Sequence, residues 1–137
     1  MYALEMLGID EALKAINAML AEAKKNPQRP MAFCIVDQNC ELVAFARMDR
    51  CRRLVEDAAR RKAYTAARMG QTSRAWGDSV KNRNLGVADF GNPQLLGFPG
   101  GVPILVNGQV VGAVGTSGRA VEEDEAIATL GVKSITG

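Results

Sequence analysis

Cationic side chains, carboxylates and glycine-rich turns occur in this chain in a combination that is suited to binding a small anion. The groups with this potential are Arg47, Lys62, the Gly100-Gly101 turn, the Ser117-Gly118 pair, Glu123 and Asp124. An arginine presents a fork that matches a carboxylate, a lysine carries a mobile positive charge, and backbone N–H groups at glycine-rich turns bind anions. We therefore expect these groups to line one pocket that holds a small carboxylate or hydroxy acid.

Lys62 has two interpretations, which the sequence leaves open. It either forms an ion pair with Asp124 or Glu123, or it contacts a ligand. A lysine that is removed from water has a lowered pKa and can act as a general base or form a Schiff base, with Asp124 as its proton partner. In that second interpretation Lys62, Asp124 and Glu123 are the catalytic residues of a lyase or isomerase that needs no cofactor.

The composition excludes several kinds of site. The chain contains no histidine, so catalytic triads that use histidine, most zinc sites and haem held by histidine are excluded. Cys34, Cys40 and Cys51 are odd in number and have no C-x-x-C spacing. We expect them to be free thiols, because this pattern fits neither a disulfide framework nor a zinc site.

Charge and hydropathy limit the partners. The net charge of +2 at pH 7 is too small to indicate a nucleic acid partner. Basic residues concentrate between Arg47 and Arg68, and acidic residues follow at Glu122–Glu125; such a basic stripe is a solvated face, an attraction for anions or a contact between subunits. No run approaches the roughly 20 apolar residues of a membrane helix. The start of the chain lacks the pattern of a secretory signal, so we expect a cytoplasmic protein.

The elements that must position the candidate residues follow from hydrophobic periodicity. Helical patterns cover residues 9–25, 54–69 and 122–130, and a shorter one runs from a cap at Thr72 or Ser73 to Lys81. We expect Asp10 to cap the first helix, since aspartate is a preferred N-cap residue, and Gly70 to end the second.

Apolar runs with strand character occupy residues 31–36, 41–48, 94–98, 102–106 and 109–116. Asn107-Gly108 separates the last two runs, and this dipeptide predicts a tight hairpin because both positions need a positive φ. We expect an α+β fold with a mostly antiparallel five-stranded sheet flanked by helices. The 137 residues fit a single domain, 1–137, that buries enough surface to fold without metal or disulfide.

These segments resemble, in chain order, the motifs of the GlcG/HbpS family. The residues that carry the resemblance are Ile35–Asp37, Leu42–Asp49, Lys62–Ala67, the Phe98–Pro103 turn, Gly108, Gly112, Gly115, Ser117-Gly118 and Glu123–Glu125. The resemblance implies a profilin-like sheet and a symmetric homo-oligomer. Its Phe-x-Gly-Gly-x-Pro turn adds Phe98 to the candidate ligand-binding residues.

The family resemblance also shapes the functional hypotheses. Members include haem-binding sensors, a haem-binding domain joined to a corrinoid adenosyltransferase, and proteins encoded among genes for the breakdown of small organic acids and diols. Our first hypothesis is a protein that binds a small organic acid and assists a catabolic pathway without a cofactor. The alternatives are the lyase or isomerase described above, and a haem-binding or redox-sensing module. Without histidine, haem would need an axial ligand among Tyr64, Met48, Met69 and the cysteines.

Overall fold

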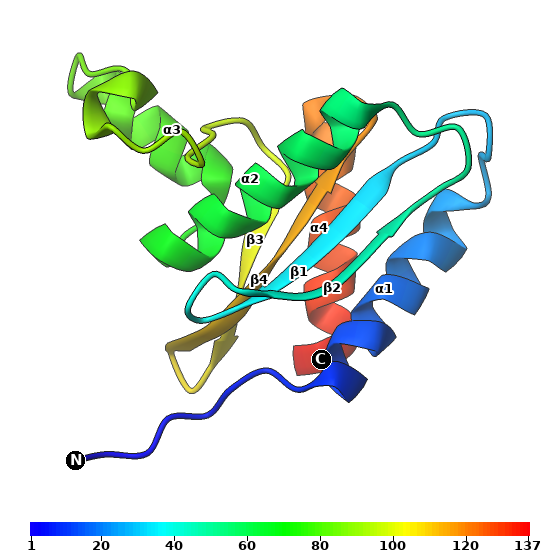
Figure 1. Cartoon of the computed structure of the whole chain (residues 1–137), viewed down its shortest axis with the longest axis horizontal. Coiled ribbons are helices and arrows are strands. Elements are labelled where there is room, and N and C mark those ends of the chain that lie inside the picture. Colours follow the sequence, from blue (N-terminus) through cyan, green and yellow to red (C-terminus); the bar gives the residue numbers. More distant parts are fainter.

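A four-stranded antiparallel sheet forms the centre of the computed structural model, which describes residues Met1–Gly137 (Figure 1). Its strands are β1 (Ala32–Asp37), β2 (Leu42–Arg47), β3 (Gly101–Val106) and β4 (Gln109–Ser117). They lie in the order β2-β1-β4-β3. Each hairpin therefore contributes one central and one edge strand, and β1 pairs with β4 where the two hairpins meet.

Helices cover both faces of the sheet. Four α-helices are present: α1 (Ile9–Ala23), α2 (Arg53–Met69), α3 (Ser73–Asn82) and α4 (Val121–Thr136), with a short 3-10 turn at Val87–Phe90. Figure 1 shows α1 and α4 on one face and α2 on the other, while α3 extends beyond the sheet. None of the helices has the length and apolar character that crossing a membrane requires.

Most helix ends lie within two residues of the predicted ones, but the N-cap of α1 and the end of α4 differ from the prediction. Gly8, not Asp10, is the N-cap of α1, and Asp10 lies in the first turn, where its negative charge is favourable. The last helix continues past Leu130 to Thr136. Gly70 ends α2 in the left-handed conformation, and the Thr72 hydroxyl caps α3 by accepting the N–H of Ala75 at 3.1 Å.

The expected fifth strand at residues 94–98 does not form, so the prediction of five strands was wrong. This segment is a loop whose backbone is held by side chains from two helices. The N–H of Leu96 donates to the Thr65 hydroxyl at 2.9 Å, and the Ser73 hydroxyl donates to the carbonyl of Phe98 at 2.6 Å. Apolar residues therefore gather here because the loop packs against helices, with no neighbouring strand.

Two cores of different character lie on the two faces of the sheet. Large side chains such as Met19, Phe33 and Ile127 fill the space between α1, α4 and the sheet. Under α2 the core consists mostly of alanines, with Cys34 and Val55 among them. Because these side chains are small, α2 lies very close to the sheet, and it brings Lys62 to the end of β4.

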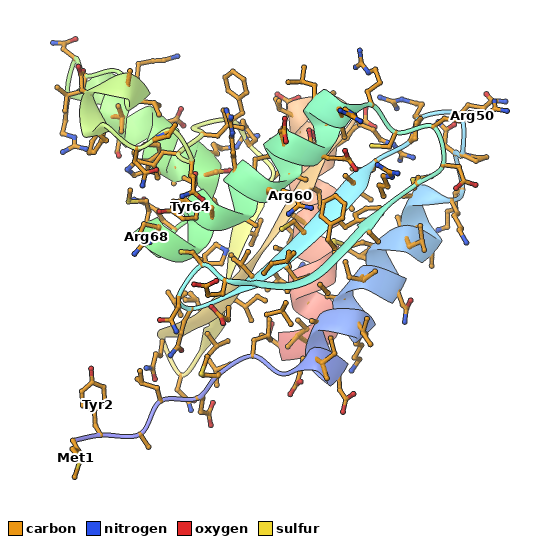
Figure 2. All side chains as sticks on the ribbon, viewed as in Figure 1. Met1, Tyr2, Arg50, Arg60, Tyr64 and Arg68 are labelled. Atoms are coloured by element: carbon orange, nitrogen blue, oxygen red, sulfur yellow. The ribbon has the colours of Figure 1, made fainter.

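The first residues of the chain form an extended arm that leaves the body of the molecule (Figures 1 and 2). The side chains of Met1, Tyr2, Leu4 and Met6 are exposed along this arm. Arg60 of α2 extends toward β2 (Figure 2), and its guanidinium lies 4.5 Å from the centre of the Phe45 ring. Phe45 belongs to the edge strand β2, and Arg60 covers one face of its ring.

Candidate functional site

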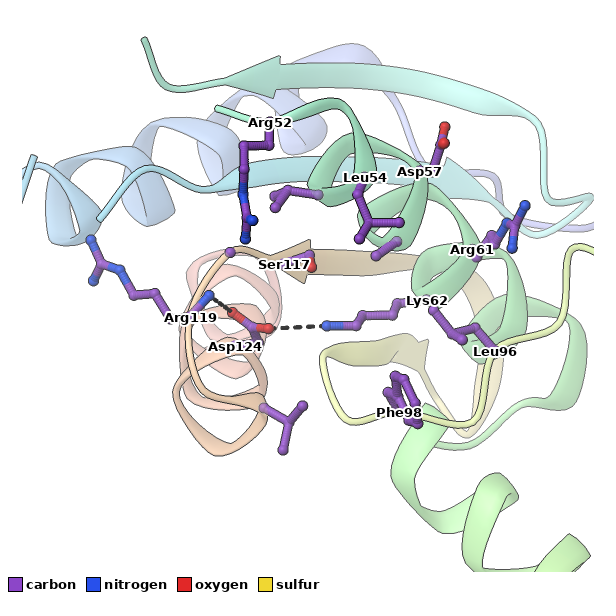
Figure 3. Close-up of a pocket in the computed structure, with 14 residues that line it drawn as sticks. Arg52, Leu54, Asp57, Arg61, Lys62, Leu96, Phe98, Ser117, Arg119 and Asp124 are labelled. Atoms are coloured by element: carbon purple, nitrogen blue, oxygen red, sulfur yellow. Dashed lines mark hydrogen bonds and ion pairs between the residues drawn. The ribbon is translucent and has the colours of Figure 1, made fainter. Parts of the chain in front are cut away.

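A cavity of about 360 Å³ opens where the start of α2, the 96–98 loop, the end of β4 and the start of α4 meet (Figure 3). Its lining residues are Arg52, Leu54, Val55, Asp57, Ala58, Arg61, Lys62, Leu96, Phe98, Ser117, Gly118, Arg119, Val121 and Asp124. The lining combines a few convergent polar groups with an apolar wall, which is typical of small-molecule sites. We therefore take this cavity as the candidate site.

A buried ion pair lies at the inner wall of the cavity. The Lys62 ammonium donates to the Asp124 carboxylate and to the Thr116 carbonyl, each at 3.0 Å from Nζ. The exposed fractions of the two side chains are only 3% and 2%. The other carboxylate oxygen of Asp124 accepts the backbone N–H of Arg119 at 3.0 Å. The ion pair expected as one interpretation of Lys62 is thus present, with Asp124 as the partner.

Burial changes the protonation equilibrium of the Asp124 carboxyl. Burial raises the pKa of the Asp124 carboxyl above its usual value, because a carboxylate loses its hydration there, while the Lys62 ammonium and the Arg119 N–H act in the opposite direction. An ammonium has three donors, and the protein uses two of those of Lys62. One N–H of Lys62 therefore has no partner within the chain.

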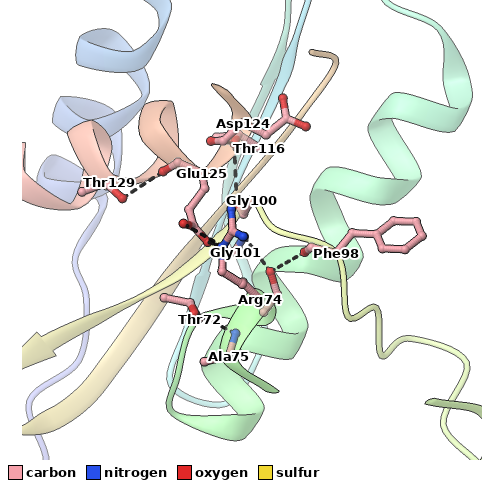
Figure 4. A network of polar contacts seen from close by, with 11 residues as sticks. Thr72, Arg74, Ala75, Phe98, Gly100, Gly101, Thr116, Asp124, Glu125 and Thr129 are labelled. Carbon is pink, nitrogen blue, oxygen red and sulfur yellow. Dashed lines mark hydrogen bonds and ion pairs between the residues drawn. The ribbon is translucent and has the colours of Figure 1, made fainter. Parts of the chain in front are cut away.

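The loop at Phe98–Gly101 is fixed by a network of hydrogen bonds (Figure 4). The Ser73 hydroxyl donates to the Phe98 carbonyl and accepts the N–H of Gly101. The N–H of Thr116 donates to the Gly100 carbonyl at 2.9 Å, and the Thr116 hydroxyl donates to the carbonyl of Asp124. The network thus ties this loop, β4 and α4 together around Lys62.

Gly100 and Gly101, which the sequence analysis predicts as an anion-binding turn, do not line the cavity. Gly100 has a φ of 133°, and a Cβ built there would lie 2.9 Å from Nζ of Lys62. A Cβ on Gly101 would overlap the backbone carbonyl of Lys62. These two glycines therefore leave room for Lys62 to reach Asp124.

The structure brings together some of the predicted site residues and separates others. Lys62, Asp124, Phe98, Ser117 and Gly118 all line the cavity. Arg47 and Glu123 do not, like Gly100 and Gly101, so the hypothesis of a single pocket is corrected for these four residues. The Arg47 guanidinium pairs with Glu56, and Glu123 pairs with Arg29. Helix α2 and the α1–β1 connection supply these partners, which no local pattern showed.

Three arginines at the cavity were missed. Arg52 and Arg61 form no ion pair with the protein, and in Figure 3 Arg52 points toward the turn at Ser117 and Arg119. The Arg119 guanidinium donates to the carbonyls of Ala23, Asn26 and Arg29, so it fastens the turn to the end of α1. The basic stripe in the sequence contained Arg52 and Arg61, and its possible attraction for anions was the signal that pointed to them.

A comparison with protein families identifies the family of this chain. The model described as haem degrading protein HbpS-like matches residues 7–133. The chain belongs to the HbpS-like family. GlcG of Escherichia coli strain K12 is 34% identical, over 70% of this chain and 69% of GlcG. An uncharacterized 15.0 kDa protein in the dhaT-dhaS intergenic region of Citrobacter freundii is 35% identical, over 80% of this chain and 85% of that protein.

Solved structures show the same HbpS-like fold. Klebsiella pneumoniae ORFY has a TM-score of 0.91 at 23% identity and covers 100% of this chain and 95% of its own. A double mutant of Streptomyces reticuli HbpS has a TM-score of 0.87 at 25% identity, over 97% and 89%. The PduOC:haem complex has a TM-score of 0.86 at 25% identity, over 96% of each chain. The family resemblance seen in the motifs is confirmed.

The haem in one of these HbpS-like structures raises the question of whether the residues here fit it. None of the expected axial ligands lines the cavity. The sulfur of Met48 accepts the N–H of Met31, and the Tyr64 hydroxyl is hydrogen-bonded to Arg68 and Asn92. Burial raises the pKa of the Cys34 thiol to about 12, which disfavours the thiolate. The residues around this cavity therefore do not fit haem, and we derive no chemistry through it.

Proposed function

We propose that this HbpS-like protein is a cytoplasmic accessory protein of catabolism that binds a small carboxylate in the cavity beside Lys62. The supporting observation is that three cationic groups with unused hydrogen-bond donors, on Arg52, Arg61 and Lys62, face one cavity. The accessory role rests on the family resemblance.

The burial of Lys62 strengthens this proposal. A charged hydrogen bond is stronger where water is excluded, and Lys62 is almost completely buried. Arg52 and Arg61 are exposed, so they are available to attract an anion, and the guanidinium fork matches the two oxygens of a carboxylate. The expected order is attraction by the arginines followed by a contact with Lys62.

Calorimetric titration tests this binding. Small carboxylates and their primary amides are titrated at the same pH into the wild type and into the Arg52→Gln/Arg61→Gln double variant. We expect the wild type to bind the carboxylates and to show no binding of the amides. The double variant should lose most of its affinity for the carboxylates. Arg53→Gln is the matched control, because Arg53 lies on α2 outside the cavity. Equal binding of acids and amides would contradict the proposal.

A second candidate function is proton transfer by Lys62 and Asp124. The supporting observation is the raised pKa of a carboxyl that contacts a buried amine at the cavity wall. Such a pair can remove a proton from a carbon next to a carbonyl group and return it. Glu123 is held by Arg29, so the proposal is limited to the two buried residues.

NMR in D₂O separates this function from simple binding. If the pair transfers protons, a bound 2-oxo acid exchanges the hydrogens on the carbon next to its oxo group for deuterium. Lys62→Gln and Asp124→Asn are expected to stop the exchange while circular dichroism confirms that they are folded. Binding without exchange in the wild type leaves only the first function.

We further propose that the protein forms a homo-oligomer, supported by the free edge of β2. This strand pairs only with β1, and it contains neither the proline nor the lysine that commonly protect an edge. The opposite edge strand, β3, carries Pro103. The exposed apolar arm at the start of the chain adds a second surface that a partner copy would cover.

A further inference from the structure

The size of the cavity is large for an acid of two or three carbons. The cavity measures about 360 Å³. This volume lies within the range of roughly 300–1,000 Å³ that is typical of pockets for drug-sized ligands. A short acid would fill only the part of this space beside the cationic groups.

The remaining space has an apolar wall. Leu54 is 72% exposed and Phe98 is 61% exposed, and both line the cavity together with Leu96 and Val121. Figure 3 shows Leu54 and Phe98 on opposite sides of the line from Lys62 to Asp124. Apolar side chains that line a cavity provide surface that a bound molecule can cover.

The wall is also held in place before a ligand arrives. The Ser73 hydroxyl binds the carbonyl of Phe98 at 2.6 Å, and Gly97 packs directly against Gly77 of α3. Leu54 lies in the first turn of α2. The backbone of each side chain is thus fixed while its apolar surface is left uncovered, and a fixed site loses little entropy on binding.

The polar groups of the cavity select the charge of the ligand. Arg52 points toward Ser117 at one end (Figure 3), and this end suits one carboxylate. Four cationic side chains, on Arg52, Arg61, Lys62 and Arg119, line the cavity against the two carboxylates of Asp57 and Asp124. The lining therefore favours a negatively charged ligand.

We propose that the ligand is a carboxylic acid with an apolar body, an aryl or longer alkyl group, which lies between Leu54 and Phe98 while its carboxylate contacts Arg52. This inference rests on the proposed carboxylate-binding function and specifies its ligand class. An aromatic body is suited to the Phe98 ring, since aromatic pairs gain energy beyond their buried area.

Calorimetry with a matched series tests this inference. The probes are acetate, butyrate, hexanoate and 3-phenylpropionate, with hexanamide as the uncharged partner of hexanoate. We expect the affinity to rise about fourfold for each buried methylene group, and 3-phenylpropionate to bind more tightly than acetate.

Variants of the apolar wall provide the second measurement. Leu54→Ser and Phe98→Ser are expected to weaken 3-phenylpropionate severalfold and to leave acetate unchanged. Both side chains are exposed, so folding is not at risk, and Leu85→Ser is the matched control because Leu85 is exposed outside this cavity.

The outcomes separate the two proposals. Equal affinity for acetate and 3-phenylpropionate, with no effect of either wall variant, overturns the inference and keeps carboxylate binding. Equal affinity for hexanoate and hexanamide overturns carboxylate binding and with it the ligand class. No binding by any acid in the series overturns both.

Discussion

Lys62 and Asp124 form a buried ion pair, and the hydration that both charges lose on burial means that such a pair adds little to the stability of the fold. Both side chains are almost fully buried, and removing two charges from water costs several kcal/mol per ion before their attraction offsets it. An apolar pair of similar volume is often as stable or more stable. The pair therefore points to a role at the cavity that it lines.

Removal of one partner is expected to be more harmful than removal of both. Lys62→Met leaves the Asp124 carboxylate buried without its cation, which costs about 3–5 kcal/mol of unfolding free energy. Lys62→Met/Asp124→Leu should recover most of this loss. Urea denaturation measures these differences, and Lys25→Met, which breaks the exposed pair with Glu22, is the control. A loss for Lys62→Met as small as that of the control would contradict the prediction.

Asp124 also gives the protein a pH dependence with a definite sign. Its pKa in the folded protein is raised above the ordinary value of 3.8. At a pH between the ordinary pKa and the raised pKa, the folded protein therefore keeps a proton that the unfolded chain has released. The stabilisation from this proton is complete below the ordinary pKa and is lost as the pH rises through the raised one. We expect the unfolding free energy of the wild type, relative to Asp124→Asn, to fall as the pH increases from about 4. A rise over the same interval, measured by urea denaturation, would be the opposite result.

At the scale of elements, the close packing of α2 on β4 positions Lys62. A Cβ on Gly115 of β4 would overlap the carbonyl of Ala59 and the N–H of Ala63, both in α2. The glycine lets the helix backbone contact the strand directly, and the small alanine side chains of α2 keep the distance between helix and sheet short. The helix that carries Lys62 therefore depends on one residue of the opposing strand.

Gly115→Ala is expected to displace α2. Overpacking of this kind costs about 1–3 kcal/mol, and the shift should also weaken carboxylate binding, since Lys62 moves with the helix. Thermal or urea unfolding and the calorimetric titration measure the two effects. For comparison, a Cβ on Gly86 would make only an ordinary contact of 3.7 Å with Asp89, so Gly86→Ala should change stability by less than about 0.5 kcal/mol. Equal effects of the two variants would show that the close packing does not matter.

At the scale of the whole molecule, the two edges of the sheet differ in their protection. Leu42 on β2 is 51% exposed and Leu105 on β3 is 44% exposed, but only β3 contains a proline. A second copy can pair with β2 through backbone groups that have no partner within the chain.

Light scattering on a gel-filtration column tests the proposed homo-oligomer. We expect the wild type to be larger than one chain, and Leu42→Lys to reduce its mass by placing a charge on the β2 edge. Leu105→Lys places the same charge on the other edge and should leave the mass unchanged. A monomeric wild type, or loss of the oligomer in both variants, would contradict pairing through β2.

Much of the architecture could be predicted because its signals are local. The alanine-rich face of α2, the left-handed Gly70 and the Asn107-Gly108 turn each lie within a few residues of the structure that they determine. Residues 94–98 show the limit of such signals. Their apolar run suits either a strand or a loop on a helix, and the contacts with Thr65 and Ser73 that decide between them lie far away in the chain.

The candidate site divides in the same way. The chain alone determined that histidine chemistry is absent and that the protein belongs with a known group of α+β proteins. It also led to the hypothesis that Lys62, Asp124 and Glu123 are the catalytic residues. Only the tertiary structure decided which charges meet, because Lys62 and Asp124 are 62 residues apart in the chain. In the folded protein Arg47 pairs with Glu56, and Arg52 lines the cavity in its place. Pairing of charges depends on distances in space, and those exist only once helices and sheet are packed.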